Sequence, residues 1–290
     1  MSNSTAINPE IGQTITAAGL ATNLHDQGSG EPVVLIHGSG PGVTAWANWR
    51  GIIPGLAEQC RVIAPDMSGF GYTERKPGTD YHMEHWLTHI LGILDALELD
   101  QVNLVGNSFG GALALALSIR HPERVKRLIL MGSVGVKFDI TEGLDDVWGY
   151  TPSMDNMRHI VGWFGATPDL AHNDDLVALR YHASIRPGFQ ESYSQMFPAP
   201  RQRWVDAMAS REEDIRTLPH ETLLVHGRED RVIPVETSWT LAQWIPNAQF
   251  HLFSNCGHWT QIEQQARFSR LVTDFLQEGQ AQPNTIEATQ

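Results

Sequence analysis

Short apolar runs alternate along the chain with longer segments in which apolar residues recur at helical spacing. Strands are predicted at residues 33–37, 61–65, 102–105, 127–131, 222–226 and 249–253. Helices are predicted at residues 46–58, 83–97, 112–119, 235–244 and 261–277. Residues 11–25 have the alternation of an antiparallel hairpin. Strands that alternate with helices indicate an α/β fold, with a mostly parallel central sheet flanked by helices.

The alternation stops after the strand predicted at 127–131. Residues 134–210 contain no clear strand, and Pro and Gly interrupt their helical pattern. We therefore expect a helical lid at 134–210, inserted into a core domain made of 1–133 and 211–290. The large aromatic side chains of this insertion should mostly pack the lid, with about a third facing a cavity below it.

Composition narrows the classes of protein. The 290 residues suffice for one large α/β domain with an insertion, or for two small domains, and 41% are hydrophobic. The net charge is −13, with no run of Lys and Arg, so a nucleic-acid partner is not expected. An anionic substrate would have to be bound by local donors rather than by the overall field.

The chain has two cysteines, Cys60 and Cys256, which do not form a disulfide framework. Residues 1–10 lack a signal-peptide pattern, and no apolar run reaches the ~20 residues of a membrane helix. These features predict a cytoplasmic protein with no membrane association. The polar tail from Glu278 onward is expected to be frayed.

The most informative motif is Val-Gly-Asn-Ser-Phe-Gly-Gly at residues 105–111. It lies between a predicted strand and a predicted helix, the setting of a nucleophile elbow, Gly-x-Ser-x-Gly. The turn leaves no room for side chains at Gly106 and Gly110. It would raise the Ser108 hydroxyl above the sheet, where the helix N-terminus stabilises a developing anion. The alternative is a serine that only caps the helix.

A serine nucleophile needs a base, and the base needs a group to orient it. In α/β-hydrolases the chain order is Ser, then Asp or Glu, then His. Asp230 follows the strand at 222–226, and His258 follows the strand at 249–253. Both then lie at the sheet edge where Ser108 lies. Taken singly, Asp230 could be a turn residue and His258 a surface histidine.

An oxyanion hole requires two backbone N–H groups that face the reacting carbonyl. One should come from Phe109, directly after the nucleophile. The other should come from Ser39 in the loop His-Gly-Ser-Gly-Pro-Gly at 37–42, whose three glycines allow the amides to turn inward. The loop does not continue into a phosphate-binding motif.

Three histidines, His82, His85 and His89, share one face of the helix predicted at 83–97. They lack the order His-Glu-x-x-His, and no cluster of carboxylates or cysteines accompanies them. We expect a solvated helix face with no metal ion, and no cofactor. Cys256 is expected to be a small buried residue rather than a nucleophile.

Several motifs together resemble those of the meta-cleavage product hydrolases, serine-dependent carbon–carbon bond hydrolases of the α/β-hydrolase fold. The resemblance covers roughly residues 11–276, and is closest to members that degrade monocyclic alkylbenzenes. The motifs are the Gly-rich loop at 37–42, Trp46-Ala-Asn48-Trp, Pro65-Asp-Met-x-Gly-Phe-Gly71, Gly106-Asn-Ser-Phe-Gly-Gly111, Trp148-Gly-Tyr-Thr-Pro, Arg180-Tyr, Phe197-Pro-x-Pro-Arg-Gln-Arg-Trp204 and Cys256-Gly-His-Trp259.

The resemblance implies hydrolysis of the C5–C6 bond of a 2-hydroxy-6-oxo-hexa-2,4-dienoate. The expected products are 2-hydroxypenta-2,4-dienoate and a carboxylic acid. Arg180 would bind the substrate carboxylate, Asn48 and Asn107 would add polar contacts, and Trp259 would close over the conjugated chain. Without the resemblance, Arg180 reads as a surface ion pair and Asn107 equally as a turn residue. The loop glycines Gly38 and Gly40 are included in the expected binding site.

The lid and pocket floor should set the size of the C6 substituent. We expect this group to contact Leu144, Trp148, Val205 and Val232, with bulky Trp148 shortening the pocket toward small alkyl groups. One methylene changes selectivity by only about 1–3 kcal/mol, so several substrates could be accepted.

Two other functions fit parts of the sequence. A carboxylesterase of the same fold would share the catalytic residues without needing a dienoate site. A binding protein that lost catalysis is disfavoured by the complete set Ser108, Asp230 and His258. The family and general base rates predict a homo-oligomer.

Overall fold

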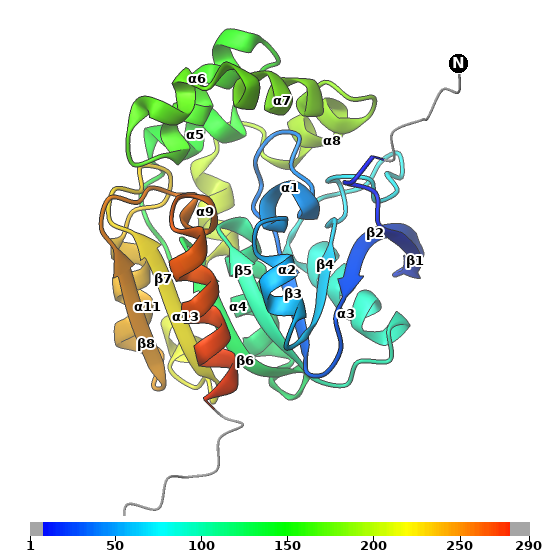
Figure 1. Cartoon of the computed structure of the whole chain (residues 1–290), viewed down its shortest axis with the longest axis vertical. Helices are drawn as coiled ribbons and strands as arrows, with labels where there is room; N and C mark the ends of the chain where they lie inside the picture. Colours follow the sequence, from blue (N-terminus) through cyan, green and yellow to red (C-terminus); the bar gives the residue numbers. More distant parts are fainter. Residues whose placement is uncertain (1–7, 279–290) are drawn as a thin grey trace, which may run out of the picture.

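The computed structural model describes residues 8–278, so most of the tail from Glu278 onward lies outside the described part. Eight strands form one sheet in the order β1-β2-β4-β3-β5-β6-β7-β8 (Figure 1). β2 pairs antiparallel with both β1 and β4, and every other neighbouring pair is parallel. The strands are β1 (Gln13–Ala17), β2 (Leu20–Gln27), β3 (Pro32–Ile36), β4 (Arg61–Pro65), β5 (Val102–Asn107), β6 (Val125–Met131), β7 (Glu221–Gly227) and β8 (Ala248–Phe253).

Helices cover both faces of the sheet, which explains why the central strands are apolar throughout. In β3, Val34 and Ile36 belong to one core, and Val33 and Leu35 to the other. The first core includes α3 (Met83–Ala96), α4 (Phe109–Arg120) and α11 (Glu236–Trp244). The second includes α1 (Ala45–Trp49), α2 (Ile53–Ala57) and α13 (Gln265–Gln277).

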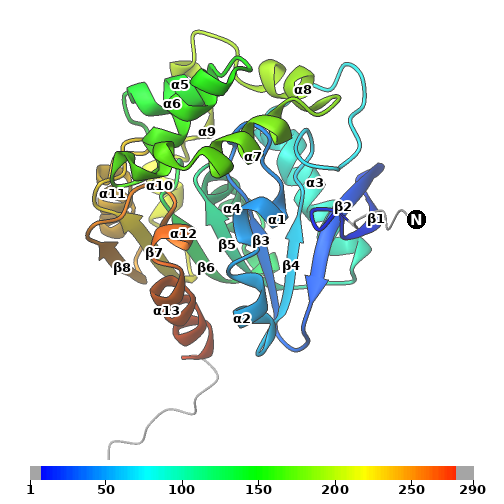
Figure 2. The same ribbon diagram turned by 45° about the horizontal axis from the view of Figure 1, so that its top comes forward.

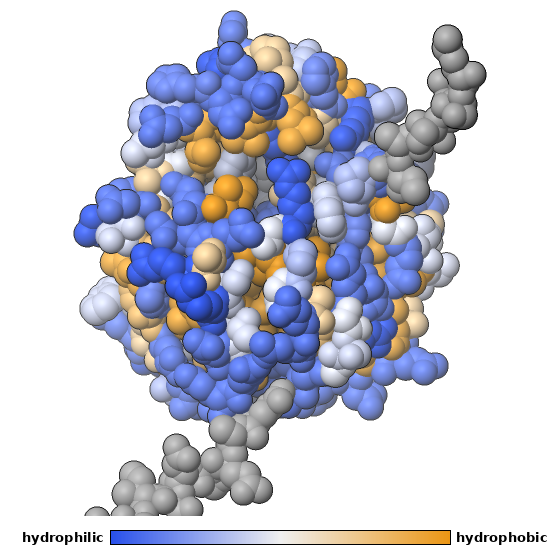
Figure 3. All heavy atoms as spheres, viewed as in Figure 1, coloured by the Kyte–Doolittle hydropathy of each residue, from blue (hydrophilic) through white to orange (hydrophobic). Residues whose placement is uncertain are grey.

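The segment between β6 and β7 is helical, as its sequence predicts. It contains α5 (Glu142–Trp148), α6 (Met154–Phe164), a 3-10 turn (Pro168–His172), α7 (Asp174–Ser184), α8 (Phe189–Met196), α9 (Gln202–Met208) and α10 (Glu212–Ile215). Figure 2 shows α6 and α7 lying across the top of the strands. Figure 3 shows apolar side chains gathered along the boundary between these helices and the sheet domain. The division into a core and a lid at 134–210 stays a prediction.

The predicted helices differ from the observed ones in two places. Residues 46–58 form two short helices rather than one, because the chain turns at Arg50 and Gly51. The last helix is divided into α12 (Thr260–Glu263) and α13, with Gln264 in a non-helical conformation between them. A further 3-10 turn, Pro122–Arg124, precedes β6. The first division leaves Asn48 near the end of a short helix that faces the loop after β3.

Candidate active site

Ser108 stands at the junction of β5 and α4, as the N-terminal cap of the helix. Its backbone has φ 55° and ψ −114°, a strained conformation for a residue with a side chain. Ser108 N–H donates to Met131 O (2.9 Å), which ties the turn to the neighbouring strand β6. A sharp turn held in this way presents the side chain above the end of the sheet.

The glycines on either side of Ser108 are required by close backbone contacts. A Cβ atom at Gly106 would lie 2.4 Å from Gly110 O, and one at Gly110 would lie 2.4 Å from Ile36 O. Neither contact is possible for a real Cβ, so the Gly-x-Ser-x-Gly spacing follows from packing of the turn against β3.

Asp230 and His258 form a buried pair next to this turn. His258 Nδ1 lies 2.7 Å from Asp230 Oδ2, and the two side chains are almost fully buried. The pair packs against Gly132, where an added Cβ would be 3.2 Å from Asp230 Oδ2. Gly132 directly follows Met131, which accepts the N–H of Ser108. Three distant parts of the sequence therefore meet at one point.

Asp230 is held as a carboxylate. Its Oδ1 accepts the N–H groups of Val232 (2.8 Å) and Ile233 (2.9 Å). Burial by itself would raise the pKa of Asp230, but the charge and hydrogen bond of His258, together with His226, lower the pKa below its ordinary value. The neighbouring Glu229 faces away and accepts the N–H of Cys256.

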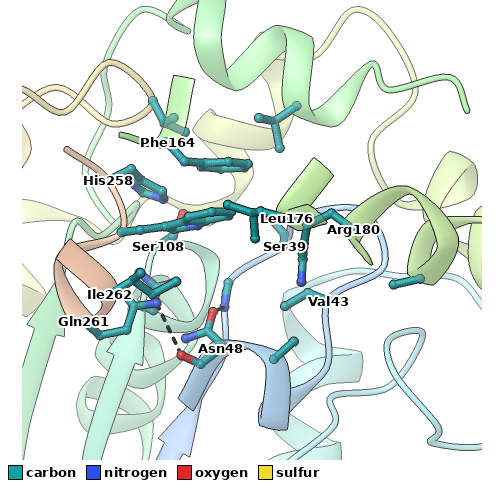
Figure 4. A pocket seen from close by; sticks show the side chains of 18 of the residues that line it. Ser39, Val43, Asn48, Ser108, Phe164, Leu176, Arg180, His258, Gln261 and Ile262 are labelled. Carbon is teal, nitrogen blue, oxygen red and sulfur yellow. Dashed lines mark hydrogen bonds between the residues drawn. The ribbon is translucent and has the colours of Figure 1, made fainter. Parts of the chain in front are cut away.

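Ser108 and His258 line one pocket beneath the lid (Figure 4). The pocket holds about 830 Å³ of empty space, including its opening. Its polar lining residues are Glu10, Ser39, Asn48, Arg50, Asn107, Ser108, Arg180, His258 and Gln261. Its other lining residues are Gly38, Gly40, Val43, Ala47, Leu144, Val147, Phe164, Leu176, Leu179, Ala183, Val232, Trp259 and Ile262. A volume of this order suits a small organic molecule.

Arg180 brings a positive charge from α7 into this pocket (Figure 4). Its Nη2 donates to Pro41 O (3.2 Å), and its guanidinium lies 5.9 Å from the ring centre of Trp259. Within residues 8–278 no carboxylate forms an ion pair with Arg180. Burial, helped by repulsion from Arg50 and Arg186, lowers its pKa to about 10. The group is still cationic at neutral pH and is available to an anion.

Comparison with known proteins places the chain in a family. The model of the alpha/beta hydrolase fold matches residues 31–265. A 2-hydroxymuconate semialdehyde hydrolase of Pseudomonas sp. strain CF600 is 64% identical, over 94% of this chain and 96% of that protein. A 2-hydroxy-6-oxo-2,4-heptadienoate hydrolase of Pseudomonas putida F1 is 62% identical, over 94% and 98%.

A solved structure agrees. The meta-cleavage product hydrolase CumD of Pseudomonas fluorescens IP01, determined as a Ser-to-Ala variant complexed with acetates, superimposes with a TM-score of 0.92. It is 58% identical and covers 94% of this chain and 100% of that chain. The chain belongs to the meta-cleavage product hydrolases. It is a carbon–carbon bond hydrolase of the α/β-hydrolase fold, as its motifs predict.

Two amide side chains of this hydrolase are buried with unused hydrogen-bonding groups. Asn48 Oδ1 accepts the N–H of Gly38 (3.3 Å), while its Nδ2 has no partner among residues 8–278. Asn107 Nδ2 is likewise unpaired. Unpaired buried polar atoms are costly unless a ligand or water satisfies them. Both donors belong to residues that line the pocket.

Gln261, at the start of α12, has an unused acceptor, whereas Asn48 and Asn107 have unused donors. The sequence analysis did not identify this residue. Its Nε2 donates to Asn48 O (3.4 Å), drawn as a dashed line in Figure 4, and its buried Oε1 has no partner. A glutamine near the start of a predicted helix is a common pattern, so the sequence alone provided no reason to select Gln261. Its place in the pocket is visible only in the structure.

Of the two expected oxyanion donors, Ser39 lines the pocket, whereas Phe109 does not but directly follows Ser108, which does. Phe109 is the first residue of α4, so its N–H has no acceptor within the helix. Ser39 lines the pocket, and its Oγ accepts Nε1–H of Trp148 from the lid (2.9 Å). The loop that carries Ser39 is thus anchored from above by an indole.

Two of the expected size-determining residues do not line the pocket. Trp148 stacks on Phe197, with ring centres 4.4 Å apart, because its N–H is directed to Ser39. Val205 in α9 is fully buried elsewhere in the lid. Leu144 and Val232 do line the pocket, joined by Val147, which the sequence analysis did not name. Of the aromatic side chains within residues 134–210, Phe164 alone is among the residues that line the pocket, fewer than the third expected from the sequence.

The prediction of a solvated histidine face on α3 is wrong for His89, whereas His82 is exposed and His85 is half-buried. His89 is buried, with Nε2 2.8 Å from Thr22 Oγ1, and its Nδ1 accepts the N–H of Ser68. His82 caps the helix instead. The helix packs this face against β2 and the loop after β4. In the part of the chain that the structure describes, no group of three or more His, Cys, Asp or Glu could hold a metal ion.

Cys256 is a free, buried thiol, and burial raises its pKa to about 12. It is therefore unsuited to act as a nucleophile at neutral pH. None of the helices between residues 8 and 278 is long and apolar enough to cross a membrane.

Proposed function

We propose that the protein hydrolyses the C5–C6 bond of 2-hydroxy-6-oxo-hexa-2,4-dienoates with small groups at C6. The products are 2-hydroxypenta-2,4-dienoate and a carboxylic acid. The observation that carries this proposal is the pocket that contains Ser108 and His258. It combines the unpaired cation of Arg180 and three amide side chains with an apolar lining at Leu144, Val147 and Val232.

In the proposed complex, Arg180 binds the substrate carboxylate. Asn48, Asn107 and Gln261 contact the dienoate, with Gln261 Oε1 accepting the 2-hydroxyl proton. Trp259, which stacks on Phe164 with ring centres 4.4 Å apart, provides a flat surface for the conjugated chain. The C6 group then meets the apolar lining.

The reaction runs in two stages. First the bound dienol is ketonised: the 2-hydroxyl loses its proton and C5 gains one, relayed by His258. This makes the leaving C5 part of a stabilised dienolate when it departs. A simple carbanion would be far too basic to leave.

Ser108 then attacks C6 while His258, oriented by Asp230, takes the hydroxyl proton. The C6 oxyanion accepts the N–H groups of Ser39 and Phe109, an arrangement that typically contributes about 3 kcal/mol per donor. The C5–C6 bond breaks, and the electron pair is delocalised into the dienolate. His258 returns its proton to the departing dienolate, which gives 2-hydroxypenta-2,4-dienoate. His258, again a free base, then deprotonates the water that hydrolyses the acyl-enzyme, and Ser108 regains its proton as the carboxylic acid leaves. No cofactor takes part in this scheme.

A spectrophotometric assay tests the proposal directly. Mixing the protein with 2-hydroxy-6-oxohepta-2,4-dienoate should bleach the yellow dienoate. Slow bleaching beside rapid hydrolysis of p-nitrophenyl acetate would instead support a carboxylesterase. Ser108→Ala should abolish turnover while still binding the dienoate, and turnover near the wild-type rate would contradict the nucleophile.

Arg180 can be tested against a matched arginine. Arg180→Ala should lower kcat/KM for the dienoate by about 100-fold and spare neutral esters, because a charge-assisted pair is lost. Arg158, on the lid surface with Asp174, serves as the control. Equal losses on both substrates would contradict a carboxylate-binding role.

A location in the bacterial cytoplasm and a homo-oligomeric state form part of the proposal. The free thiols Cys60 and Cys256 support a reducing compartment. Size-exclusion chromatography with light scattering measures the subunit number, and a monomer at micromolar concentration would contradict the oligomer.

A further inference from the structure

A second imidazole lies against the carboxylate of Asp230. His226, in β7, is fully buried, and its Nε2 is 3.3 Å from Asp230 Oδ2 and 3.0 Å from Ile233 O. Its Nδ1 is 2.7 Å from Ser238 Oγ in α11. His226 does not line the pocket that contains Ser108. The mechanism above gives it no task.

The surroundings of His226 determine where its proton sits. Nε2 faces two oxygen acceptors, a carbonyl and a carboxylate, so this nitrogen carries a hydrogen. Ser238 Oγ lies 2.7 Å from Nδ1 and can donate its hydroxyl proton to that nitrogen. The ring is thereby fixed in one tautomer and one orientation, with an N–H beside Asp230.

Both oxygens of Asp230 have close polar neighbours, although the hydrogen bond of His226 Nε2 is directed to Ile233 O and Nε2 only approaches Oδ2, at 3.3 Å. Oδ1 faces the N–H groups of Val232 and Ile233, and Oδ2 faces His258 and His226. Cys256, Glu229 and Glu263 are the other titratable groups near this cluster. Each of them directs its polar atom elsewhere: Glu229 to Cys256 N, Glu263 to the N–H groups of residues 166 and 257, and Cys256 toward Gly257 O.

We propose that His226 is a positioning residue that acts on His258 through Asp230. Its Nε2–H, anchored on Ile233 O, lies 3.3 Å from Oδ2 and offsets part of the negative charge that faces Nδ1 of His258. A carboxylate that already donates part of its charge to one partner attracts an imidazolium less strongly.

This moderation matters because His258 must both take and return a proton. A carboxylate whose charge is not shared would stabilise the imidazolium of His258 more strongly and so oppose the return of the proton. His226 thus keeps the base available. The inference rests on the proposed roles of Ser108, His258 and Asp230, and it does not depend on the dienoate.

The test compares two replacements of similar length. His226→Met removes the N–H, whereas His226→Gln places an amide N–H near the former Nε2. We measure kcat/KM against pH for p-nitrophenyl acetate and for the dienoate. The acidic limb should move up by about one pH unit in His226→Met, which corresponds to about a 10-fold loss of kcat/KM at pH values well below the midpoint of the limb. His226→Gln should stay within about 3-fold of wild type.

A double-mutant cycle asks whether the effect passes through Asp230. In an Asp230→Asn background, adding His226→Met should cost less than about 2-fold, because the shared charge is already gone. If the two losses multiply, the proposal is overturned. It is also overturned if His226→Met keeps the wild-type pH profile, or if Met and Gln replacements cause equal losses.

Should His226→Met fail to fold, Ser238→Ala decides the question. It frees the other side of the same ring, so the acidic limb should move in the same direction, and an unchanged profile overturns the proposal. Failure of the substrate assignment is separately visible: wild type would then cleave the ester and leave the dienoate intact. If Ser108→Ala were active on both substrates, the proposed catalytic residues and the role of His226 would fall together.

Discussion

The hydrogen bond between the Trp148 indole and Ser39 leads to a quantitative prediction about catalysis. The two side chains are 3% and 5% exposed, and the hydrogen bond between them is 2.9 Å long. Trp148→Phe removes this bond but preserves an aromatic ring that can stack on Phe197. Ser39 would keep its place in the loop while losing the partner that anchors it from the lid.

The magnitude follows from the chemistry of a neutral, buried hydrogen bond. Such a bond contributes about 1 kcal/mol net, and a stranded buried hydroxyl costs about 1–3 kcal/mol. We expect the free energy of unfolding to fall by about 1–2 kcal/mol. Since the N–H of Ser39 is a proposed oxyanion donor, loosening it should lower kcat by about 10-fold and leave KM nearly unchanged.

Trp204 offers a matched control in the same lid. Its Nε1 donates to Pro198 O at an exposed site, so Trp204→Phe removes a comparable bond away from the pocket. Dienoate bleaching gives kcat and KM, and urea unfolding gives stability. If Trp148→Phe lost stability but kept the wild-type kcat, the indole would hold only the lid, and the reasoning about the oxyanion loop would be refuted.

Three further predictions concern other buried groups. Gln261→Leu removes a buried acceptor that has no partner within residues 8–278, and with it the long 3.4 Å hydrogen bond from Nε2 to Asn48 O. Because these two effects offset each other, thermal melting should show nearly unchanged stability while KM for the dienoate rises about 10-fold. A clear fall in stability with unchanged KM would contradict the proposed role of Gln261. Burial lowers the pKa of His89 from the ordinary 6.5 to about 4. The neutral side chain therefore contributes up to about 3 kcal/mol to the free energy of unfolding above pH 6.5, and this contribution is lost as the pH falls toward 4. The stabilities of wild type and His89→Gln, measured by urea unfolding, should converge between pH 6.5 and pH 4, and a constant difference would contradict this sign. Glu263→Gln leaves one N–H of the pair at Ala166 and Gly257 without its acceptor, so kcat should fall about 5-fold, and an unchanged kcat would show that this link is not needed for turnover.

The sequence was sufficient to predict the order of strands and helices because every central strand is apolar on both faces. It also predicted Ser108, Asp230 and His258, since each follows a strand and the parallel connections bring those ends to one edge. The position of each of these residues directly after a strand was informative, because the carboxyl ends of parallel strands lie at the same edge of the sheet.

The side-chain contacts inside the lid were not predictable in the same way. Trp148 is bulky and was expected in the pocket, but its N–H finds Ser39, more than 100 positions away in the sequence. His89 has the spacing of a surface residue and is buried because β2 covers it. Gln261 is unremarkable until α1 places the carbonyl of Asn48 beside it. Such partners are set by tertiary packing, which local patterns do not encode.

The loop that carries His258, the proposed general base, is joined to the end of α6 by backbone hydrogen bonds. Phe164 O accepts the N–H groups of His258 and Trp259, and the Glu263 carboxylate bridges the N–H groups of Ala166 and Gly257. The end of α6 therefore cannot move away from the sheet without displacing His258. We therefore expect substrate and products to enter and leave near Leu179 and Arg50, which line the pocket and are exposed to solvent. His258 and Asp230 would then stay in place during each exchange.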